Sequence, residues 1–244
     1  KNFIKMDAPE ISVVVLAYRS AETISSFVDS LVDSLEKENL QWEIVLVGNY
    51  FEGKGDQTPE VINKIASQEP RIKVVTKIKK GMMGWDMKTG LQAATGKALA
   101  VIDGDGQMPS GDVVRVYQLM KENGLDLAKT YRAKRNDGSY RRFISAVYNV
   151  LFKIMFPGIK ASDMNSKPKI MTRAFYEKIN LDSNGWFIDA EIMILARRLN
   201  IKIGEIETIF HSMDSRPSFV KPLSILEFLF NLFNYRIREF LVKK

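Results

Sequence analysis

The chain has 244 residues, 45% of them hydrophobic, which is enough for one sizeable core and excludes a disordered chain. It has no cysteine, so disulfides and thiolate metal sites are excluded and a reducing compartment is expected. The formal net charge of +7 suits phosphorylated substrates or anionic lipid head groups. Without a repeated basic–aromatic pattern, we do not expect a nucleic-acid partner.

The first half of the chain alternates strands with helices. Apolar, β-branched runs predict buried strands, and apolar residues at helical spacing predict the helices between them. In chain order we expect strand 11–17, helix 21–37, strand 42–47, a helix from Pro59, strand 71–76, helix 84–94, strand 99–102, helix 110–122 and strand 126–130. This alternation predicts an α/β fold with a mostly parallel sheet flanked by helices.

The pattern changes after residue 130. Residues 131–142 are predicted to form a polar, arginine-rich loop. The elements expected beyond it are helix 143–156, strand 167–172, helix 187–199, strand 201–206 and a very apolar helix 222–242.

In a parallel sheet, ligands bind outside the carboxyl ends of the strands. The loops after the first four strands therefore share one edge. We expect these loops to bring together Tyr18, Asn49, Lys80 and Asp103.

A metal site is predicted at Asp103-Gly104-Asp105, directly after a buried strand. Two carboxylates on a tight turn can face one hard cation, and Mg²⁺ or Mn²⁺ takes oxygen ligands from carboxylates and substrate phosphates. Gln107 is close enough in sequence to add an oxygen or to hold a bound water. The predicted metal residues are Asp103, Asp105 and Gln107, with an ordinary polar turn as the alternative. His211, the only histidine, is explained more simply as a hydrogen-bonded side chain than as a third ligand.

This turn and the first strand resemble glycosyltransferase family 2 with the GT-A (Rossmann-like) fold, on the branch of dolichyl- and polyprenyl-phosphate sugar synthases. Residues 101–109 (VIDGDGQMP) resemble the metal segment of that family, and residues 15–19 (VLAYR) resemble its nucleotide-lining opening. The resemblance covers roughly residues 10–220 and implies an inverting, metal-dependent glycosyltransferase.

The resemblance also implies a nucleotide-sugar site. Its predicted residues are Ala17, Tyr18, Arg19, Asn49, Lys80, Gly84 and Asp103. The family usually has two acidic residues after the second strand, where this chain has Gly48 and Asn49. An asparagine offers both a donor and an acceptor, so we expect base recognition to be retained in altered form.

The arginine-rich segment resembles the acceptor-phosphate segment of the family, and planar guanidinium groups suit phosphate. The predicted acceptor residues are Arg132, Arg135, Arg141, Arg142 and Ser145. The predicted catalytic residues are Asp103, Asp105, Arg141, Ser145, Asp163 and Glu191, the last two by resemblance. A lipid phosphate is already an anion and needs no strong base, whereas a sugar hydroxyl acceptor would need a carboxylate from Asp163, Asp189 or Glu191.

Residues 223–235 (LSILEFLFNLFNY) are too short to span a bilayer and are followed by Arg236 and Arg238. This arrangement is typical of a helix lying in a membrane interface. We therefore predict a catalytic domain, residues 1–220, and a C-terminal amphipathic membrane-interface helix, residues 221–244. The expected location is the cytoplasmic face of a membrane, with the chain peripheral or anchored by a segment outside it.

The expected function is sugar transfer from a nucleotide sugar to a polyprenyl (dolichyl or undecaprenyl) phosphate at the membrane surface. Two alternatives stay open: a soluble glycosyltransferase acting on a sugar hydroxyl, and a catalytically weak nucleotide-sugar-binding scaffold. Homo-oligomerisation also stays open, because the apolar C-terminal helix suits a dimer interface as well as a membrane.

Overall fold

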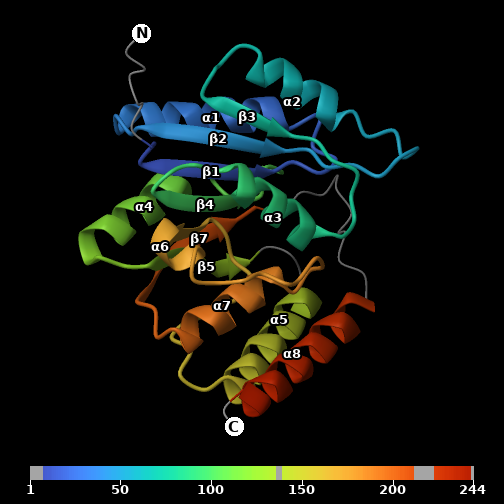
Figure 1. Ribbon diagram of the computed structural model, residues 1–244, viewed down its shortest axis with the longest axis vertical. Coiled ribbons are helices and arrows are strands. Elements are labelled where there is room, and N and C mark those ends of the chain that lie inside the picture. The colour runs from blue at the N-terminus through green and yellow to red at the C-terminus, as the bar shows by residue number, and fades with distance from the viewer. Residues whose placement is uncertain (1–7, 136–138, 212–222, 243–244) are drawn as a thin grey trace.

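The computed structural model describes residues 8–135, 139–211 and 223–242, and for residues 134–135, 139–145, 223–225 and 242 it describes the backbone alone. A seven-stranded sheet of order β3-β2-β1-β4-β6-β5-β7 forms the centre (Figure 1). The strands are β1 (Ile11–Leu16), β2 (Trp42–Val47), β3 (Ile72–Val75), β4 (Ala98–Asp103), β5 (Leu127–Arg135), β6 (Lys169–Thr172) and β7 (Ile203–Phe210). Only β6 runs antiparallel to its neighbours among these strands, which confirms the predicted mostly parallel α/β sheet.

Helices cover both faces of the sheet. One face carries α1 (Ile24–Lys37), α2 (Thr58–Ala66) and α4 (Asp112–Asn123). The other carries α3 (Met83–Ala93), α5 (Ser139–Met155), α6 (Arg173–Tyr176), α7 (Ile188–Arg198) and α8 (Leu223–Val242). Because successive strand residues point to opposite faces, Val13 and Val15 join the first core and Val14 and Leu16 the second.

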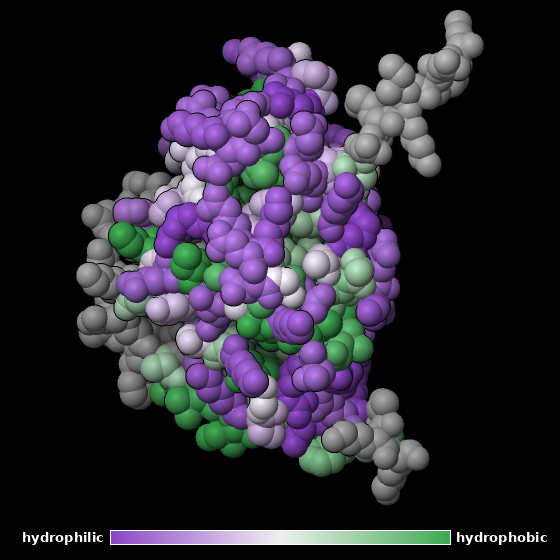
Figure 2. All heavy atoms as spheres, turned by 90° about the vertical axis from the view of Figure 1, so that its left-hand side faces the viewer, coloured by the Kyte–Doolittle hydropathy of each residue, from purple (hydrophilic) through white to green (hydrophobic). Residues whose placement is uncertain are grey.

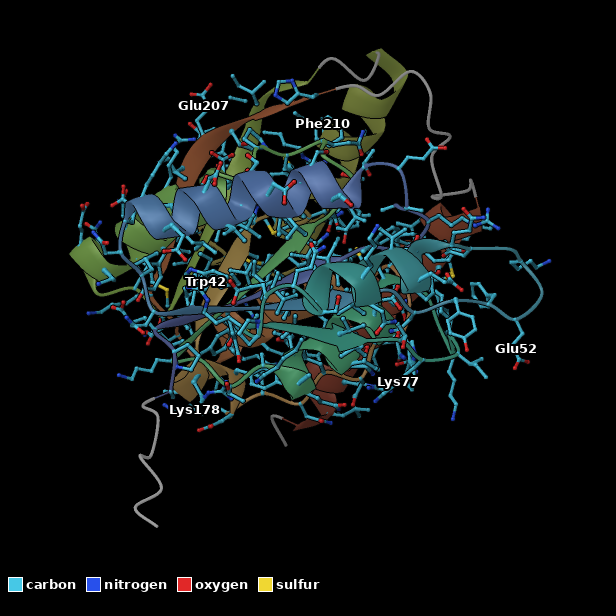
Figure 3. The ribbon with its side chains drawn as sticks, turned by 90° about the horizontal axis from the view of Figure 1, so that it is seen from above. Trp42, Glu52, Lys77, Lys178, Glu207 and Phe210 are labelled. Carbon is cyan, nitrogen blue, oxygen red and sulfur yellow. The ribbon has the colours of Figure 1, made fainter. Side chains whose placement is uncertain are left out.

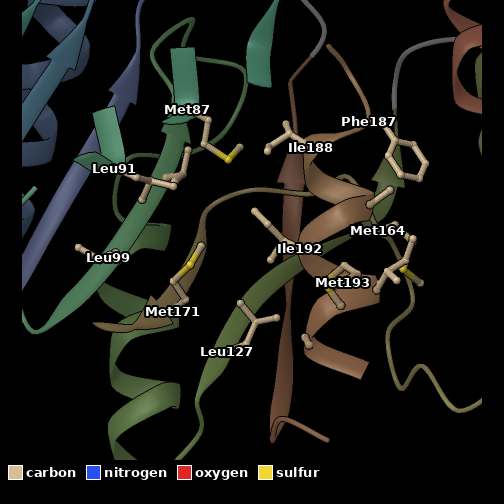
Figure 4. Packing of buried hydrophobic residues seen from close by; sticks show 14 of the residues in the cluster. Met87, Leu91, Leu99, Leu127, Met164, Met171, Phe187, Ile188, Ile192 and Met193 are labelled. Carbon is tan, nitrogen blue, oxygen red and sulfur yellow. The ribbon is translucent and has the colours of Figure 1, made fainter. Parts of the chain in front are cut away.

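Helix α7 lies in the second core, so its acidic residues are buried. Figure 4 shows Met87 and Leu91 of α3, Leu99 of β4 and Ile192 of α7 directed into the same apolar cluster. Every residue of α7 from Ile188 to Ile194 is buried. This helix therefore carries two carboxylates into the interior, where each needs a partner.

The segment after residue 130 differs from the prediction. β5 continues to Arg135 and α5 begins at Ser139, so the predicted polar loop over 131–142 is wrong. β5 pairs in parallel with β7 as far as Arg135 opposite Phe210, with an irregularity between Arg132 and Lys134. Backbone hydrogen bonds to β7 hold this polar segment as a strand, although its arginine-rich sequence does not predict one.

The last helix packs on the second core through one side. The rings of Phe228 and Tyr148 of α5 lie 5.2 Å apart, and those of Tyr235 and Phe187 lie 5.3 Å apart. Figure 1 shows α5 and α8 side by side at the end of the molecule away from β3. Within the described ranges, no helix is long and apolar enough to cross a membrane.

Candidate active site

The order of the strands creates a topological switch point at the carboxyl ends of β1 and β4. The chain passes from β1 to β2 and β3 and then returns to place β4 on the other side of β1, where Leu16 pairs with Asp103. Such a switch point is where open α/β sheets bind ligands. Figure 3 shows Glu52 and Lys77, which follow β2 and β3, at the opposite end of the sheet from Trp42, where β2 begins. The predicted common edge is therefore present.

The Asp103–Gln107 turn lies at this edge. Asp103, the last residue of β4, keeps 37% of its side chain exposed, and Asp105 is partly exposed. Oδ1 of Asp105 accepts a hydrogen bond of 3.0 Å from the backbone N–H of Gln107. Between them Gly106 has φ +78°, a conformation that glycine adopts without steric cost. The turn thus holds two carboxylates close to solvent.

These residues fit a hard divalent cation. Among the described residues, no group of three or more histidine, cysteine, aspartate or glutamate side chains could hold a metal. A cation here would take oxygens from Asp103 and Asp105 and fill its remaining positions with substrate or water oxygens, as Mg²⁺ often does. His211 is joined to Gln107 through its backbone N–H, which donates to the Gln107 carbonyl at 2.9 Å.

Lys167, which no sequence motif indicated, contacts this turn. Its buried Nζ lies 3.3 Å from Oδ2 of Asp103 and 3.0 Å from Oδ2 of Asp189. Burial disfavours the ammonium, but the two carboxylates outweigh it and raise the pKa of Lys167 above its ordinary value. The Asp103 carboxylate is therefore held by a permanent cation from the segment before β6.

The loop after β1 is fixed to the start of α2. The backbone N–H of Arg19, a residue with φ +51°, donates to Oδ2 of Asp56 at 3.2 Å. The N–H of Ser20 donates to the Thr58 hydroxyl at 2.9 Å. Tyr18 lies at the edge with its ring centroid 4.5 Å from Nζ of Lys79. The structure thus brings Ala17, Tyr18 and Arg19 to the predicted edge, beside a lysine that sequence reasoning missed.

Asn49 is fully buried and its side chain is engaged. Its Nδ2 donates to Oδ1 of Asp86 and to the Thr89 hydroxyl, both at 2.9 Å, and its Oδ1 accepts from the Lys77 N–H at 2.8 Å. Asp86 also forms an ion pair with Lys79, and burial lowers the pKa of Lys79 and raises that of Asp86. Asn49 therefore joins β2 to α3, and its predicted contact with the base stays a prediction.

Two other predicted donor residues have different surroundings. Lys80 is exposed, with its Nζ 5.9 Å from the Trp85 ring, whereas its neighbour Lys79 is buried. Gly84 donates its N–H to the Gly185 carbonyl at 2.9 Å, and a Cβ at Gly84 would lie 2.5 Å from the Ser183 carbonyl oxygen. The need for glycine at 84 thus comes from close packing of α3 on residues 183–185.

Of the predicted acceptor residues, Arg132 is paired with Asp163. Nε of Arg132 donates to Oδ2 of Asp163 at 2.6 Å and Nη2 to Oδ1 at 2.9 Å. The other predicted acceptor residues lie on the last residue of β5 and the first two turns of α5, where only the backbone is described; they are Arg135, Arg141, Arg142 and Ser145. Their phosphate-binding role stays a prediction.

Glu191 is fully buried and accepts three hydrogen bonds. The donors are the N–H of Asp182 at 2.8 Å, the N–H of Ser183 at 3.0 Å and the hydroxyl of Tyr235. These contacts tie α7 to the 182–183 segment and to α8. These hydrogen bonds give the Glu191 carboxylate a structural role. They do not support its predicted catalytic role.

The family follows from comparison with known proteins. The family model described as glycosyl transferase family 2 matches residues 12–188, more than half of the chain. The chain belongs to glycosyl transferase family 2.

This family 2 chain is 26% identical over 221 residues to a dolichyl-phosphate beta-glucosyltransferase of Trichomonas vaginalis, covering 84% of the chain. It is 26% identical over 149 residues to an undecaprenyl-phosphate 4-deoxy-4-formamido-L-arabinose transferase of Pectobacterium atrosepticum, covering 60% of the chain. The chain spans 66% and 44% of the lengths of these two relatives.

Solved structures confirm the GT-A fold of this chain. Mannosyl-3-phosphoglycerate synthase from Rubrobacter xylanophilus has a TM-score of 0.68 and 16% identity, with 95% of this chain and 74% of that chain covered. Glucosyl-3-phosphoglycerate synthase from Mycobacterium tuberculosis, in complex with Mn²⁺, uridine diphosphate and phosphoglyceric acid, has a TM-score of 0.66 and 20% identity, with 90% and 74% covered. At such identities the likeness concerns the fold alone.

Proposed function

We propose that this chain is the catalytic unit of a metal-dependent glycosyltransferase that moves a sugar from a nucleotide donor to a polyprenyl phosphate. The observation that carries the proposal is the place of Asp103 and Asp105, separated only by Gly104, at the switch point between β1 and β4. Family membership and the dolichyl-phosphate and undecaprenyl-phosphate acceptors named for the two relatives support it.

On the donor side, Asp103 and Asp105 would hold Mg²⁺ or Mn²⁺, and the cation would supply positive charge to neutralise the diphosphate leaving group. The base and ribose would enter beside Tyr18, whose ring already lies against the ammonium of Lys79. Asn49 would act there through Asp86, to which it donates a hydrogen bond, rather than by direct contact.

On the acceptor side, a lipid phosphate is an anion and needs orientation more than deprotonation. We assign that orientation to Arg135, Arg141, Arg142 and Ser145, which follow one another from the end of β5 into α5. Arg132 would contribute with its guanidinium fixed by Asp163. Direct attack of the phosphate on the anomeric carbon would invert the configuration of the sugar.

The outer sides of α5 and α8 provide a surface for the membrane. The exposed apolar residues, here called the apolar stripe, are Val147, Val150 and Ile154 of α5 and Leu226, Phe230, Phe233, Ile237, Phe240 and Leu241 of α8. In α8 most of them recur at intervals of three or four residues, so they share one side of the helix. Figure 2 shows hydrophobic residues exposed towards the lower end of the molecule, where α5 and α8 lie in Figure 1.

Arginines accompany the stripe in α8. Arg236 lies with Cζ 4.5 Å from the Phe240 ring centroid, and the Arg238 side chain is 52% exposed. Cations beside an exposed apolar helix suit anionic head groups. We therefore propose that residues 221–244 hold the catalytic domain, residues 1–220, against the cytoplasmic face of a membrane, as a peripheral contact or beside an anchor outside this chain.

Metal-dependent binding of the nucleotide donor is tested by thermal unfolding. The ligands are uridine and guanosine diphosphates and the corresponding nucleotide sugars, each with and without Mn²⁺. A ligand that binds only the folded chain raises the unfolding temperature. We expect one nucleotide series to do so in a Mn²⁺-dependent manner in the wild type and in Asp29→Asn, an exposed control on α1, but not in Asp103→Asn or Asp105→Asn. An unchanged response in the presence of chelator would remove the metal from the proposed function.

A further inference from the structure

The ammonium of Lys167 lies between an exposed carboxylate and a buried one. It contacts Asp103, whose side chain is 37% exposed, at 3.3 Å and Asp189, whose side chain is 1% exposed, at 3.0 Å. Only 4% of the Lys167 side chain is exposed. Its third neighbour is the sulfur of Met83 at the start of α3, 3.2 Å away. The charge of Lys167 is therefore only weakly screened by bulk water.

The single negative charge of Asp189 cannot fully neutralise Lys167, because Asp189 also contacts a second buried lysine. Nζ of Lys169, on the strand that follows, lies 2.6 Å from Oδ1 of Asp189 and is fully buried. Two buried ammonium groups thus face one buried carboxylate. The unbalanced positive charge acts on the next carboxylate within reach, which is Asp103 at the end of β4.

We propose that Lys167 is a positioning residue of the metal site: it fixes the orientation of the Asp103 carboxylate and weakens the binding of a divalent cation until a nucleotide diphosphate arrives. This inference rests on the proposed metal site at Asp103 and Asp105. A cation approaching Asp103 alone meets the charge of Lys167, since both would contact the same carboxylate. The diphosphate brings enough negative charge to offset this repulsion, so metal and nucleotide bind cooperatively.

The arrangement predicts opposite effects on Mn²⁺ binding for the loss of Lys167 and for the loss of Asp189. Lys167→Met removes the competing cation and leaves Asp189 paired with Lys169. Asp189→Asn removes the carboxylate that shares Lys167, so the ammonium acts more strongly on Asp103. In the absence of nucleotide we expect Lys167→Met to bind Mn²⁺ about tenfold more tightly than the wild type, which corresponds to about 1.4 kcal/mol. We expect Asp189→Asn to bind it several-fold more weakly.

The measurement is the free Mn²⁺ signal in electron paramagnetic resonance, titrated with each protein with and without uridine or guanosine diphosphate. Lys73→Met is the control, since Lys73 is a half-exposed lysine paired with Glu43 on the outer part of the sheet. Asp103→Asn should abolish the binding measured. The nucleotide should tighten Mn²⁺ binding strongly in the wild type and only weakly in Lys167→Met.

Equal or weaker Mn²⁺ binding in Lys167→Met, or a shift of the same sign in Asp189→Asn, would overturn the inference. If Lys167→Met does not fold, the double variant Lys167→Met/Asp189→Asn, which removes one charge of each sign, should show the same tightened binding. Failure of the wild type to bind Mn²⁺ with either nucleotide would instead remove the metal from the proposed function, and the inference with it. If the wild type binds Mn²⁺ with nucleotide and Lys167→Met binds it equally well, only the inference about Lys167 is overturned and the proposed metal site stands.

Discussion

The side-chain amide of Asn49 donates a hydrogen bond of 2.9 Å to the carboxylate of Asp86, and both residues are buried. Asn49→Asp would replace this donor by a second carboxylate facing the first. Repulsion and a lost donor in the interior should lower the free energy of unfolding by roughly 2–4 kcal/mol. Urea unfolding measures this, with the exposed Asn63→Asp on α2 as a control near zero. A fully stable Asn49→Asp with a changed preference among nucleotides would show that Asn49 reads the base directly.

Lys169 should make stability depend on pH above neutrality. Burial lowers the pKa of Lys169 from 10.5 to about 8 despite the attraction of Asp189. Below pH 8 the lysine is protonated in both states; between about pH 8 and 10.5 the unfolded state holds more protons, so this contribution to stability rises with pH. Relative to Lys169→Met, the wild type should gain at most about 1.4 kcal/mol per pH unit in that window.

Urea unfolding of both proteins at pH 7.5, 9 and 10 gives the comparison. Subtracting the two curves removes other groups that titrate in this range. Parallel stability curves for the wild type and Lys169→Met would show that Lys169 keeps its ordinary pKa in the folded state.

Tyr235 should stabilise the fold without serving the chemistry. Its hydroxyl donates to buried Glu191, so Tyr235→Phe leaves a charged acceptor with one donor fewer and should cost about 1–3 kcal/mol. Tyr176→Phe, a half-buried tyrosine on α6, is the matched control. Donor binding per folded molecule should be unchanged in Tyr235→Phe. If Glu191→Gln abolished sugar transfer while keeping its unfolding temperature, Glu191 would instead be catalytic, as the family resemblance predicts.

The sequence predicts those parts of the fold whose local pattern of apolar and polar residues is compatible with only one kind of element. Residues 11–16 and 98–102 are almost entirely apolar and end at polar turns, so the strands and the edge that carries Asp103 could be predicted from local pattern. β5 could not be predicted beyond residue 130, because its polar end is held by β7, about seventy residues later in the chain.

The buried lysines show that local sequence pattern is also insufficient to predict the site. Lys129, Lys167 and Lys169 lie in the predicted strands 126–130 and 167–172, but the sequence pattern does not predict that their ammonium groups are buried. Each is buried because residues distant in sequence supply oxygen acceptors. Lys129 contacts Glu205 at 2.9 Å, and Lys169 contacts Asp189 at 2.6 Å. The alternation of two lysines around Pro168 at the start of a predicted strand was a usable signal, but the acceptors were visible only in three dimensions.

The apolar stripe of α5 and α8 should bind membranes. Phe230 and Phe240 are 71% and 61% exposed, so Phe230→Ser/Phe240→Ser should change stability by less than about 1 kcal/mol while releasing the chain from anionic liposomes. Ile209→Ser, at a 53% exposed position on β7, is the control and should still co-sediment. A wild-type chain that forms a dimer and stays in the supernatant would assign the stripe to self-association.

Transfer of a sugar to a polyprenyl phosphate can be measured directly. The most direct measurement follows labelled sugar from the nucleotide that stabilises the chain into undecaprenyl or dolichyl phosphate held in anionic liposomes, with Mn²⁺ present. We predict that label enters the organic phase with inverted anomeric configuration, and that Asp103→Asn abolishes this transfer while Asp29→Asn retains it. Label that stays out of the organic phase and appears on a water-soluble sugar or phosphate acceptor would show that a polyprenyl phosphate is not the acceptor.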